Sequence, residues 1–79
     1  MDDLTDLIEF IAKALVDDPD AVGVKAIEGE KTIILELTVG EGDLGKVIGK
    51  DGRTAQSIRT LLHAAANKAG KRAFLDIVD

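Results

Sequence analysis

The segment LGKVIGKDGR, residues 44–53, decides the fold of this chain. Val47 and Ile48 lead into a four-residue turn, Gly49–Gly52, which has glycine at each end, and a strongly periodic helical pattern follows at once. The segment therefore predicts two helices joined by a G-x-x-G turn. Glycine lets a backbone approach another chain closely and tolerates positive φ. The first amides of the second helix lack intrahelical acceptors and carry partial positive charge, so they favour a phosphate.

Three cations surround this turn: Lys46 before it, Lys50 within it and Arg53 after it. Together with the helix amides they predict a surface that suits a passing phosphodiester backbone. The alternative is a helical hairpin whose glycines only cap and turn, since eight glycines in 79 residues produce some G-x-x-G by chance. Val47 and Ile48 before the turn, and a predicted strand on each side, favour the phosphate-binding interpretation.

Charge is divided unequally along the chain. The net charge is −5, but residues 1–44 hold twelve acids and three bases, whereas residues 45–79 hold seven bases and three acids. The two parts therefore carry −9 and +4. A basic face on an acidic protein indicates nucleic-acid binding better than the overall charge does. Self-association between opposite faces is the alternative interpretation of the same asymmetry.

Length and composition narrow the class of protein. We expect residues 1–79 to form one domain, which is too small for a deep enzyme cleft. The chain contains no Cys, which excludes disulfides and thiolate metal sites. We identify no signal peptide, no membrane-spanning run and no Ser–His–Asp set, and His63 is the only histidine. We therefore expect a cytoplasmic protein that is not an enzyme and has no metal, no cofactor, no small-molecule substrate and no membrane contact.

Apolar spacing predicts six elements, with helices where the period is 3.6 and strands where apolar residues alternate. Asp17–Asp20 ends the first helix, because proline does not continue a helix easily. Glu28–Glu30 forms a hairpin turn, and Leu61 belongs to the apolar stripe of the last helix. The predicted helices span Asp3–Val16, Leu44–Ile48 (with Asp43 as its N-cap) and Arg53–Ala69, and the predicted strands span Ala21–Ile27, Lys31–Val39 and Arg72–Val78.

The second strand carries the clearest alternation, with Ile33, Leu35 and Leu37 on one face. A hairpin makes the first two strands antiparallel, and a two-helix crossover makes the last strand parallel to one of them. We therefore expect an α+β fold in the order α-β-β-α-α-β, with three helices packed on one face of a three-stranded mixed sheet. Phe10 is expected at the core margin, and Phe74 on the sheet's other face or at an interface.

Residues 47–53, VIGKDGR, resemble the signature of KH domains, and the element order resembles the type II KH arrangement. Beyond the fold, the sequence resembles one family in particular, the small bacterial single-KH-domain proteins of the KhpA type. This resemblance covers nearly the whole chain. The segments that carry it are IAKALVDDPDAV (11–22), EGEKTIILEL (28–37), DLGKVIGKDGRTAQSIRTLLHAAANKAGKR (43–72) and LDIVD (75–79).

The resemblance implies single-stranded RNA binding without catalysis, in which the tetrad clamps the sugar–phosphate chain and about four nucleotides lie in the adjoining groove. It also implies self-association, or pairing with a larger RNA-binding protein that has its own KH domain. Family members are linked to RNA chaperoning and to control of cell division and envelope growth. Carried over, the clamp is Gly49, Lys50, Asp51 and Gly52, the groove floor is Val47 and Ile48, the phosphate contacts are Lys46 and Arg53, and the base side is Ile58, Ile34 and Glu36.

Several alternatives remain open at this point. Asp51 places a carboxylate beside the phosphate path, which predicts modest affinity. Single-stranded DNA is not distinguished from RNA, and a protein-interaction module with a KH fold and little RNA binding is the strongest rival. The G-x-G-x-x-G at residues 40–45 lacks the βαβ unit of a dinucleotide site, and the G-x-x-x-x-G-K at residues 40–46 continues with Val47 where Ser or Thr is needed. A helix–turn–helix for duplex DNA fits the two glycines less well.

Overall fold

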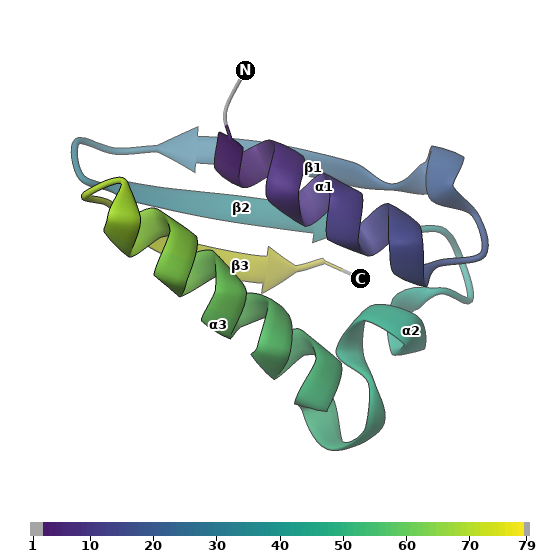
Figure 1. Ribbon diagram of the computed structural model, residues 1–79. Helices are drawn as coiled ribbons and strands as arrows, with labels where there is room; N and C mark the ends of the chain where they lie inside the picture. Colours follow the sequence, from purple (N-terminus) through teal and green to yellow (C-terminus); the bar gives the residue numbers. More distant parts are fainter. Residues whose placement is uncertain (1–2, 79) are drawn as a thin grey trace.

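The computed structural model describes residues 3–78, and within them each predicted helix and strand is present (Figure 1). Residues 1, 2 and 79, which the predicted domain includes, lie outside the described residues. The elements, in chain order, are α1 (Asp3–Leu15), η1 (a 3-10 turn, Pro19–Ala21), β1 (Gly23–Glu28), β2 (Thr32–Thr38), α2 (Leu44–Ile48), η2 (a 3-10 turn, Lys50–Gly52), α3 (Arg53–Lys68) and β3 (Arg72–Ile77).

The three strands form one mixed sheet with β2 in the centre. β1 and β2 are antiparallel, with Ala26 opposite Leu35, and the tight Glu28–Thr32 connection closes their hairpin. β2 and β3 are parallel, with Leu35 opposite Leu75. The crossover between them contains both α2 and α3, as a parallel connection requires. The α+β class and the mixed sheet predicted from sequence are confirmed.

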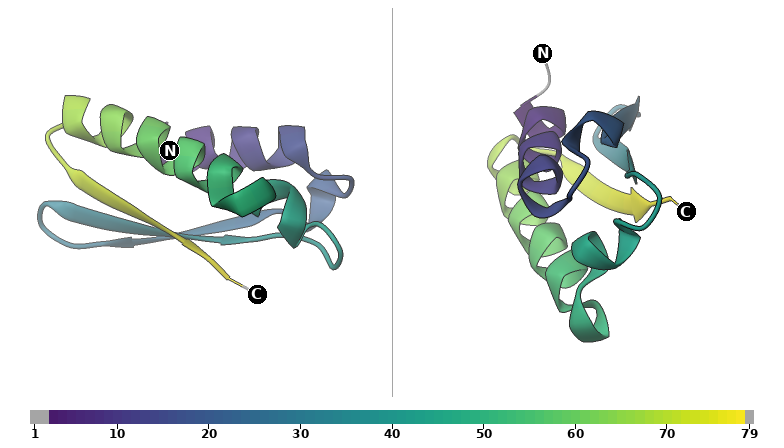
Figure 2. Two further views of the ribbon diagram at one scale, coloured as in Figure 1. Left: turned by 90° about the horizontal axis from the view of Figure 1, so that it is seen from below. Right: turned by 90° about the vertical axis from the view of Figure 1, so that its right-hand side faces the viewer.

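The helices lie on one face of the sheet and leave the other face uncovered (Figure 2). α1 and α3 run side by side over the sheet, and α2 lies at the end of the sheet where α3 begins (Figures 1 and 2). Ile33, Leu35 and Leu37 of β2 point into this layer and are fully buried. Small residues such as Ala12 of α1 and Ala66 of α3 are also buried in this layer. The alternation in β2 therefore sets which face the helices cover.

Two apolar residues differ from the sequence expectation. Phe10 is 73% exposed, so it lies on the outer surface of α1 and not at the core margin. Leu61 was placed in the buried stripe of α3, but its side chain is 54% exposed, because the buried stripe contains Ala55, Ile58 and Leu62 and is narrower than predicted. Both residues add apolar surface to the helical side of the molecule. Phe74 is exposed on the uncovered face of the sheet, as expected.

Candidate nucleic-acid interface

The turn between α2 and α3 adopts a backbone that few residue types tolerate. Gly49 has φ 75° and ψ 174°, a region occupied almost only by glycine. Asp51 (φ 56°, ψ 25°) and Gly52 (φ 73°, ψ 13°) are left-handed. Asp is among the few non-glycine residues that adopt this conformation at low cost. Asp51 thus has a local structural reason to be in the tetrad, whatever its charge does to a ligand.

The two glycines of the tetrad meet different constraints. A Cβ added to Gly49 would overlap the Thr54 side chain and would lie 2.9 Å from the Thr54 backbone nitrogen. Nothing lies within 4 Å of a Cβ added to Gly52. Gly49 is therefore fixed by packing and by conformation, since the first turn of α3 folds against it. Gly52 is fixed by conformation alone, and the space around it is open to another molecule.

Backbone hydrogen bonds hold the turn in place from inside. The Gly49 amide donates to the Gly45 carbonyl at 2.9 Å, and the Gly52 amide donates to the Gly49 carbonyl at 3.2 Å. The Arg53 amide donates to the Lys50 carbonyl. Lys50, Asp51 and Arg53 are exposed, so their side chains border the turn without bracing it. The result is a firm backbone with two cations at its rim.

Lys46, which the sequence predicts near the phosphate path, forms ion pairs within the chain. Its ammonium lies 3.0 Å from an Asp17 carboxylate oxygen and 3.5 Å from one of Asp43, so it joins α2 to the segment after α1. The hydrogen bond and the charge of Asp17 raise the pKa of Lys46. Two carboxylates thus share the charge of Lys46, whose side chain remains 41% exposed.

The Asp43 side chain is buried, and its hydrogen bonds go to the segment after α1. It precedes α2, as predicted, but makes no side-chain cap bond to that helix. Its oxygens accept the Asp18 amide at 3.1 Å and the Asp17 amide at 3.4 Å. Burial alone would raise the pKa of this carboxyl, but the two amides and Lys46 outweigh burial and hold the pKa below its ordinary value.

The remaining predicted site residues fall into two groups. Ile48 is half-buried directly before the tetrad, whereas Val47 and Ile58 are core residues with 0% and 3% exposure. Ile34 and Glu36 alternate with the buried residues of β2 and therefore lie on the uncovered face of the sheet, away from the helices. The structure thus brings together Ile48, the tetrad and Arg53. It does not bring Ile34, Glu36 or the Ile58 side chain to the same surface.

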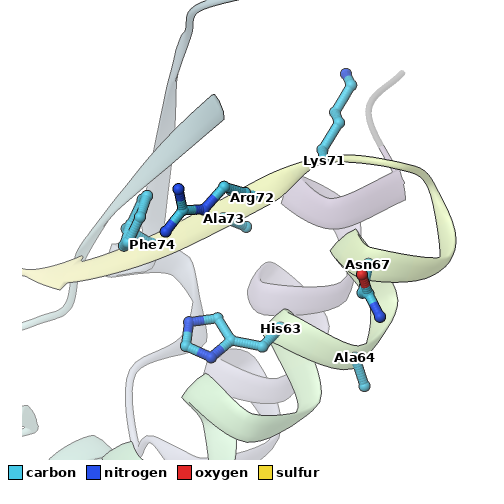
Figure 3. A pocket seen from close by; sticks show the side chains of 7 residues that line it. All are labelled: His63, Ala64, Asn67, Lys71, Arg72, Ala73 and Phe74. Atoms are coloured by element: carbon cyan, nitrogen blue, oxygen red, sulfur yellow. The ribbon is translucent and has the colours of Figure 1, made fainter. Parts of the chain in front are cut away.

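A pocket that sequence reasoning missed lies between the second half of α3 and the start of β3 (Figure 3). Its volume is about 410 Å³, and its lining includes His63, Asn67, Arg72 and Phe74. His63 and Asn67 are one helical turn apart, and Arg72 and Phe74 are on the same side of a strand. These spacings were visible in the sequence. The missing information was that β3 returns beside α3.

Two further features bear on function. Among residues 3–78, no helix is long and apolar enough to cross a membrane. The same residues contain no group of three or more His, Asp or Glu side chains placed to hold a metal ion.

Comparison with known proteins identifies the family. The family model described as "KhpA/KhpB, KH domain" matches residues 5–77, nearly all of the chain. The chain belongs to this family. The membership agrees with the tetrad at residues 49–52 and with the order of helices and strands.

Curated relatives match over almost their whole length. The protein named RNA-binding protein KhpA of Aquifex aeolicus is 52% identical over 79 residues, which is 100% of both chains. The protein of the same name from Caldanaerobacter subterraneus subsp. tengcongensis is 58% identical over 73 residues, covering 92% of this chain and 97% of the relative. The Borreliella burgdorferi protein of that name is 55% identical, covering 94% and 90%. Each of these three bacterial relatives is thus named as an RNA-binding protein.

A solved structure shows the same fold at low sequence identity. The chain aligns with a crystal structure of Era in complex with MgGDPNP and nucleotides 1506–1542 of 16S ribosomal RNA, with a TM-score of 0.65 and 20% identity. The alignment covers 94% of this chain but only 28% of that one. The likeness therefore shows the fold alone.

Proposed function

We propose that this chain binds single-stranded RNA at the G-K-D-G turn, residues 49–52, and catalyses no reaction. The observation that carries the proposal is the turn itself: a hydrogen-bonded backbone with positive φ at Gly49, Asp51 and Gly52, at the start of α3, with Lys50 and Arg53 exposed beside it. Open space around Gly52 lets a sugar–phosphate chain approach the backbone. The names of the relatives in the same family support RNA as the ligand.

The proposed contact recognises the RNA backbone more than its sequence. The amides at the start of α3 and the two cations attract phosphates, and Ile48 offers an apolar edge to a neighbouring base. The tetrad itself has no aromatic side chain for stacking. We therefore propose modest affinity with little base preference at this point of contact, consistent with an RNA chaperone or post-transcriptional regulator in the cytoplasm, linked to cell division and envelope growth.

We also propose that the protein acts as a homodimer or together with a larger KH-containing RNA-binding protein. Phe10 and Leu61 expose apolar side chains on α1 and α3, and a partner could cover them. Two clamps in one assembly would raise avidity for a single RNA without any new contact. The same exposed residues favour the second candidate function, an interaction module that keeps the KH fold and binds little RNA.

The test is a titration of labelled single-stranded RNA followed by fluorescence anisotropy. Lys50→Asp keeps both glycines of the tetrad and reverses one charge at its rim, so it should reduce affinity at least tenfold and lower the salt dependence by roughly one phosphate contact. Lys25→Asp, on β1 at the far edge of the sheet, is the matched control and should bind as the native chain does. Circular dichroism checks that both variants fold.

Each outcome separates the two candidate functions. Salt-dependent binding that Lys50→Asp removes and Lys25→Asp keeps supports the RNA clamp. Absence of binding by the native chain, or equal binding by all three proteins, contradicts the clamp and favours the interaction module. A parallel titration with DNA of the same base sequence decides whether the 2′-hydroxyl contributes.

A further inference from the structure

The face of the sheet that the helices leave uncovered carries a continuous row of apolar side chains. Ile27 is opposite Ile34 in the antiparallel pair of strands, and Ile34 is opposite Phe74 in the parallel pair. Their exposed fractions are 46%, 40% and 46%, in that order. Among residues 3–78, six large apolar side chains are exposed, and half of them lie in this one row. Scattered apolar residues are normal on a surface, whereas a contiguous row indicates a contact surface.

Polar and charged side chains flank the apolar row in an order set by the strand register. Glu36 is opposite Asp76 on one side of the row. Thr32 is opposite Arg72 on its other side. All four alternate with buried residues of β2 and β3, so they lie on the uncovered face. On β3 the order is therefore cation, ring and anion, with Phe74 between the two charges.

This pattern is self-complementary about a two-fold axis that runs along the apolar row. Rotation about that axis lays a second copy face to face on the first, with each member of the row over its own counterpart. The rotation also exchanges the two flanking sides, so Arg72 faces Asp76 of the second copy and Glu36 faces its Thr32. An axis along β2 would instead place Glu36 against its own counterpart, so the charges favour the axis along the row.

The β1 edge of the sheet fits the same arrangement. Lys25 is opposite Glu36, whereas the hairpin turn that contains Glu28 and Glu30 lies at the other end of the strands, where the Gly29 amide donates to the Thr32 carbonyl. The same rotation brings Lys25 over this acidic turn of the second copy. Opposite charges thus face each other at both edges of the sheet.

The size of the face sets the strength of the contact. Three strands about 4.8 Å apart, with six residues that rise about 3.3 Å each, give a face of about 14 by 20 Å. A standard interface buries about 800 Å² on each partner, which is more than this face offers. We therefore expect a weak, reversible contact that forms at high protein concentration.

We propose that the uncovered sheet face, centred on Ile27, Ile34 and Phe74, is a self-association surface that packs against the same face of a second copy. The inference goes beyond the proposed function, which assigns self-association to Phe10 and Leu61 on the helices. The helical side and the uncovered face are opposite sides of the molecule, so the two contacts together join copies into assemblies larger than a dimer (Figure 2). The tetrad belongs to the helical side and stays open to RNA.

Sedimentation equilibrium over a range of concentrations tests the contact by exchanging its charges. Arg72→Glu and Asp76→Lys each place like charges face to face twice, once on either side of the axis. Each should raise the dissociation constant of the sheet contact about tenfold. The double variant restores both pairs with their signs exchanged, so it should return to within about twofold of the native value.

Lys71→Glu is the matched control for the charge exchange. It makes the same change of charge as Arg72→Glu, but Lys71 precedes β3 and its side chain extends away from that of Arg72 (Figure 3). This variant should sediment as the native chain does. Circular dichroism checks that every variant folds.

A cross-linking experiment locates the axis. The chain contains no Cys, so an introduced one is its only thiol. Ile34→Cys places that thiol on the proposed axis, where a short bismaleimide should join it to the thiol of a second copy. Thr38→Cys is the control on the same strand and face. Thr38 is four residues from Ile34, about 13 Å from the axis, so two such thiols lie about 26 Å apart and should not be joined.

The outcomes separate this inference from the proposed function. Charge reversals that leave sedimentation unchanged, a double variant that associates no better than the single ones, or equal cross-linking at positions 34 and 38 overturn the inference and leave the apolar row to a different partner. Adding Lys50→Asp to Ile34→Cys should lower RNA affinity and leave cross-linking unchanged. Failure of the RNA clamp and failure of the sheet contact are thus observed independently.

Discussion

Gly49 and Gly52 are glycines of the same turn, but the structure requires glycine at the two positions for different reasons. Gly49 lies in a region that only glycine occupies readily and also contacts Thr54, whereas Gly52 lies in the ordinary left-handed region with free space around it. The G-x-x-G spacing was evident from sequence. The difference between the two positions was not, because it depends on the direction in which α3 leaves the turn.

We predict that Gly49→Ala destabilises the fold more than Gly52→Ala does. Left-handed backbone costs a non-glycine residue roughly 1–2 kcal/mol, which is all that Gly52→Ala should lose. Gly49→Ala should lose roughly 3 kcal/mol or more, because the backbone strain and the overlap with Thr54 add together. Urea denaturation followed by circular dichroism measures both. Equal losses would contradict the role assigned to the Thr54 contact.

A second prediction concerns Asp43, whose pKa is lowered in the folded state. A lowered pKa stabilises the fold above the ordinary Asp value of about 3.9, and that contribution disappears as the pH falls through the folded-state pKa. Asp43→Asn should therefore lower the urea midpoint at neutral pH, and the midpoint should then fall less between about pH 4 and pH 2. Glu41→Gln, an exposed neighbour, is the control. Parallel pH profiles for the two variants would contradict the prediction.

The ion pair of Lys46 with Asp17 marks a limit of sequence reasoning at the residue scale. Lys46 is four residues before Lys50, and in the sequence the two look alike as phosphate ligands. The structure distinguishes them, because the segment after α1 brings Asp17 within 3.0 Å of Lys46. Such a long-range contact has no local signature in the sequence.

At the element scale, β2 was predictable because period-2 alternation identifies both the strand and its buried face. The alternation did not show whether the polar face of β2 would lie beside the tetrad or on the uncovered side of the sheet. Ile34 and Glu36 were predicted on the base side of the bound RNA, but they lie on the face of the sheet that the helices leave uncovered (Figure 2). α1 was predictable in extent but not at Phe10, since a helical pattern does not show how wide the buried stripe will be.

We predict that substitutions at two adjacent isoleucines of β2 differ in how much they destabilise the fold. Ile33→Ala should cost about 2–5 kcal/mol of unfolding free energy, because Ile33 is fully buried. Ile34→Ala should cost less than about 1 kcal/mol, because its side chain faces solvent between Ile27 and Phe74. Ile34→Ala should also leave binding of four-nucleotide RNA unchanged. Chemical denaturation measures the stabilities, and fluorescence anisotropy measures RNA binding. Loss of binding to four-nucleotide RNA in Ile34→Ala would contradict the prediction and would indicate that Ile34 contacts the RNA.

At the scale of the whole molecule, one hydrophobic cluster joins α1, β2, α2, α3 and β3. Its composition was apparent from the apolar patterns, so the fold class followed from the sequence. The pocket between α3 and β3 did not follow, because strand order and the close return of β3 are properties of the assembled sheet. The apolar surface outside this cluster, which includes Phe10 and Leu61, could not be predicted from the sequence either.

That surface leads to a prediction about assembly. Light scattering should give the native chain a mass above the monomer value of 8.4 kDa, with the mass rising as concentration increases. Phe10→Ser should shift the mass toward the monomer without unfolding the protein, since Phe10 is 73% exposed. Ala14→Ser, which also changes an exposed residue of α1, is the control. A strict monomer at all concentrations would contradict self-association.

The parallel pairing of β2 with β3 has a consequence for synthesis of the protein. Thr32 pairs with Arg72 and Leu37 with Ile77, so each contact joins residues forty positions apart. Until the ribosome has made β3, the nascent chain holds a two-stranded hairpin, which is only marginally stable, and the open edge of β2. Because such non-local contacts form slowly, the sheet is completed only after translation of the crossover. In the growing chain, residues 45–72, which carry the seven bases of the second part of the chain, are thus exposed before the fold that positions them exists.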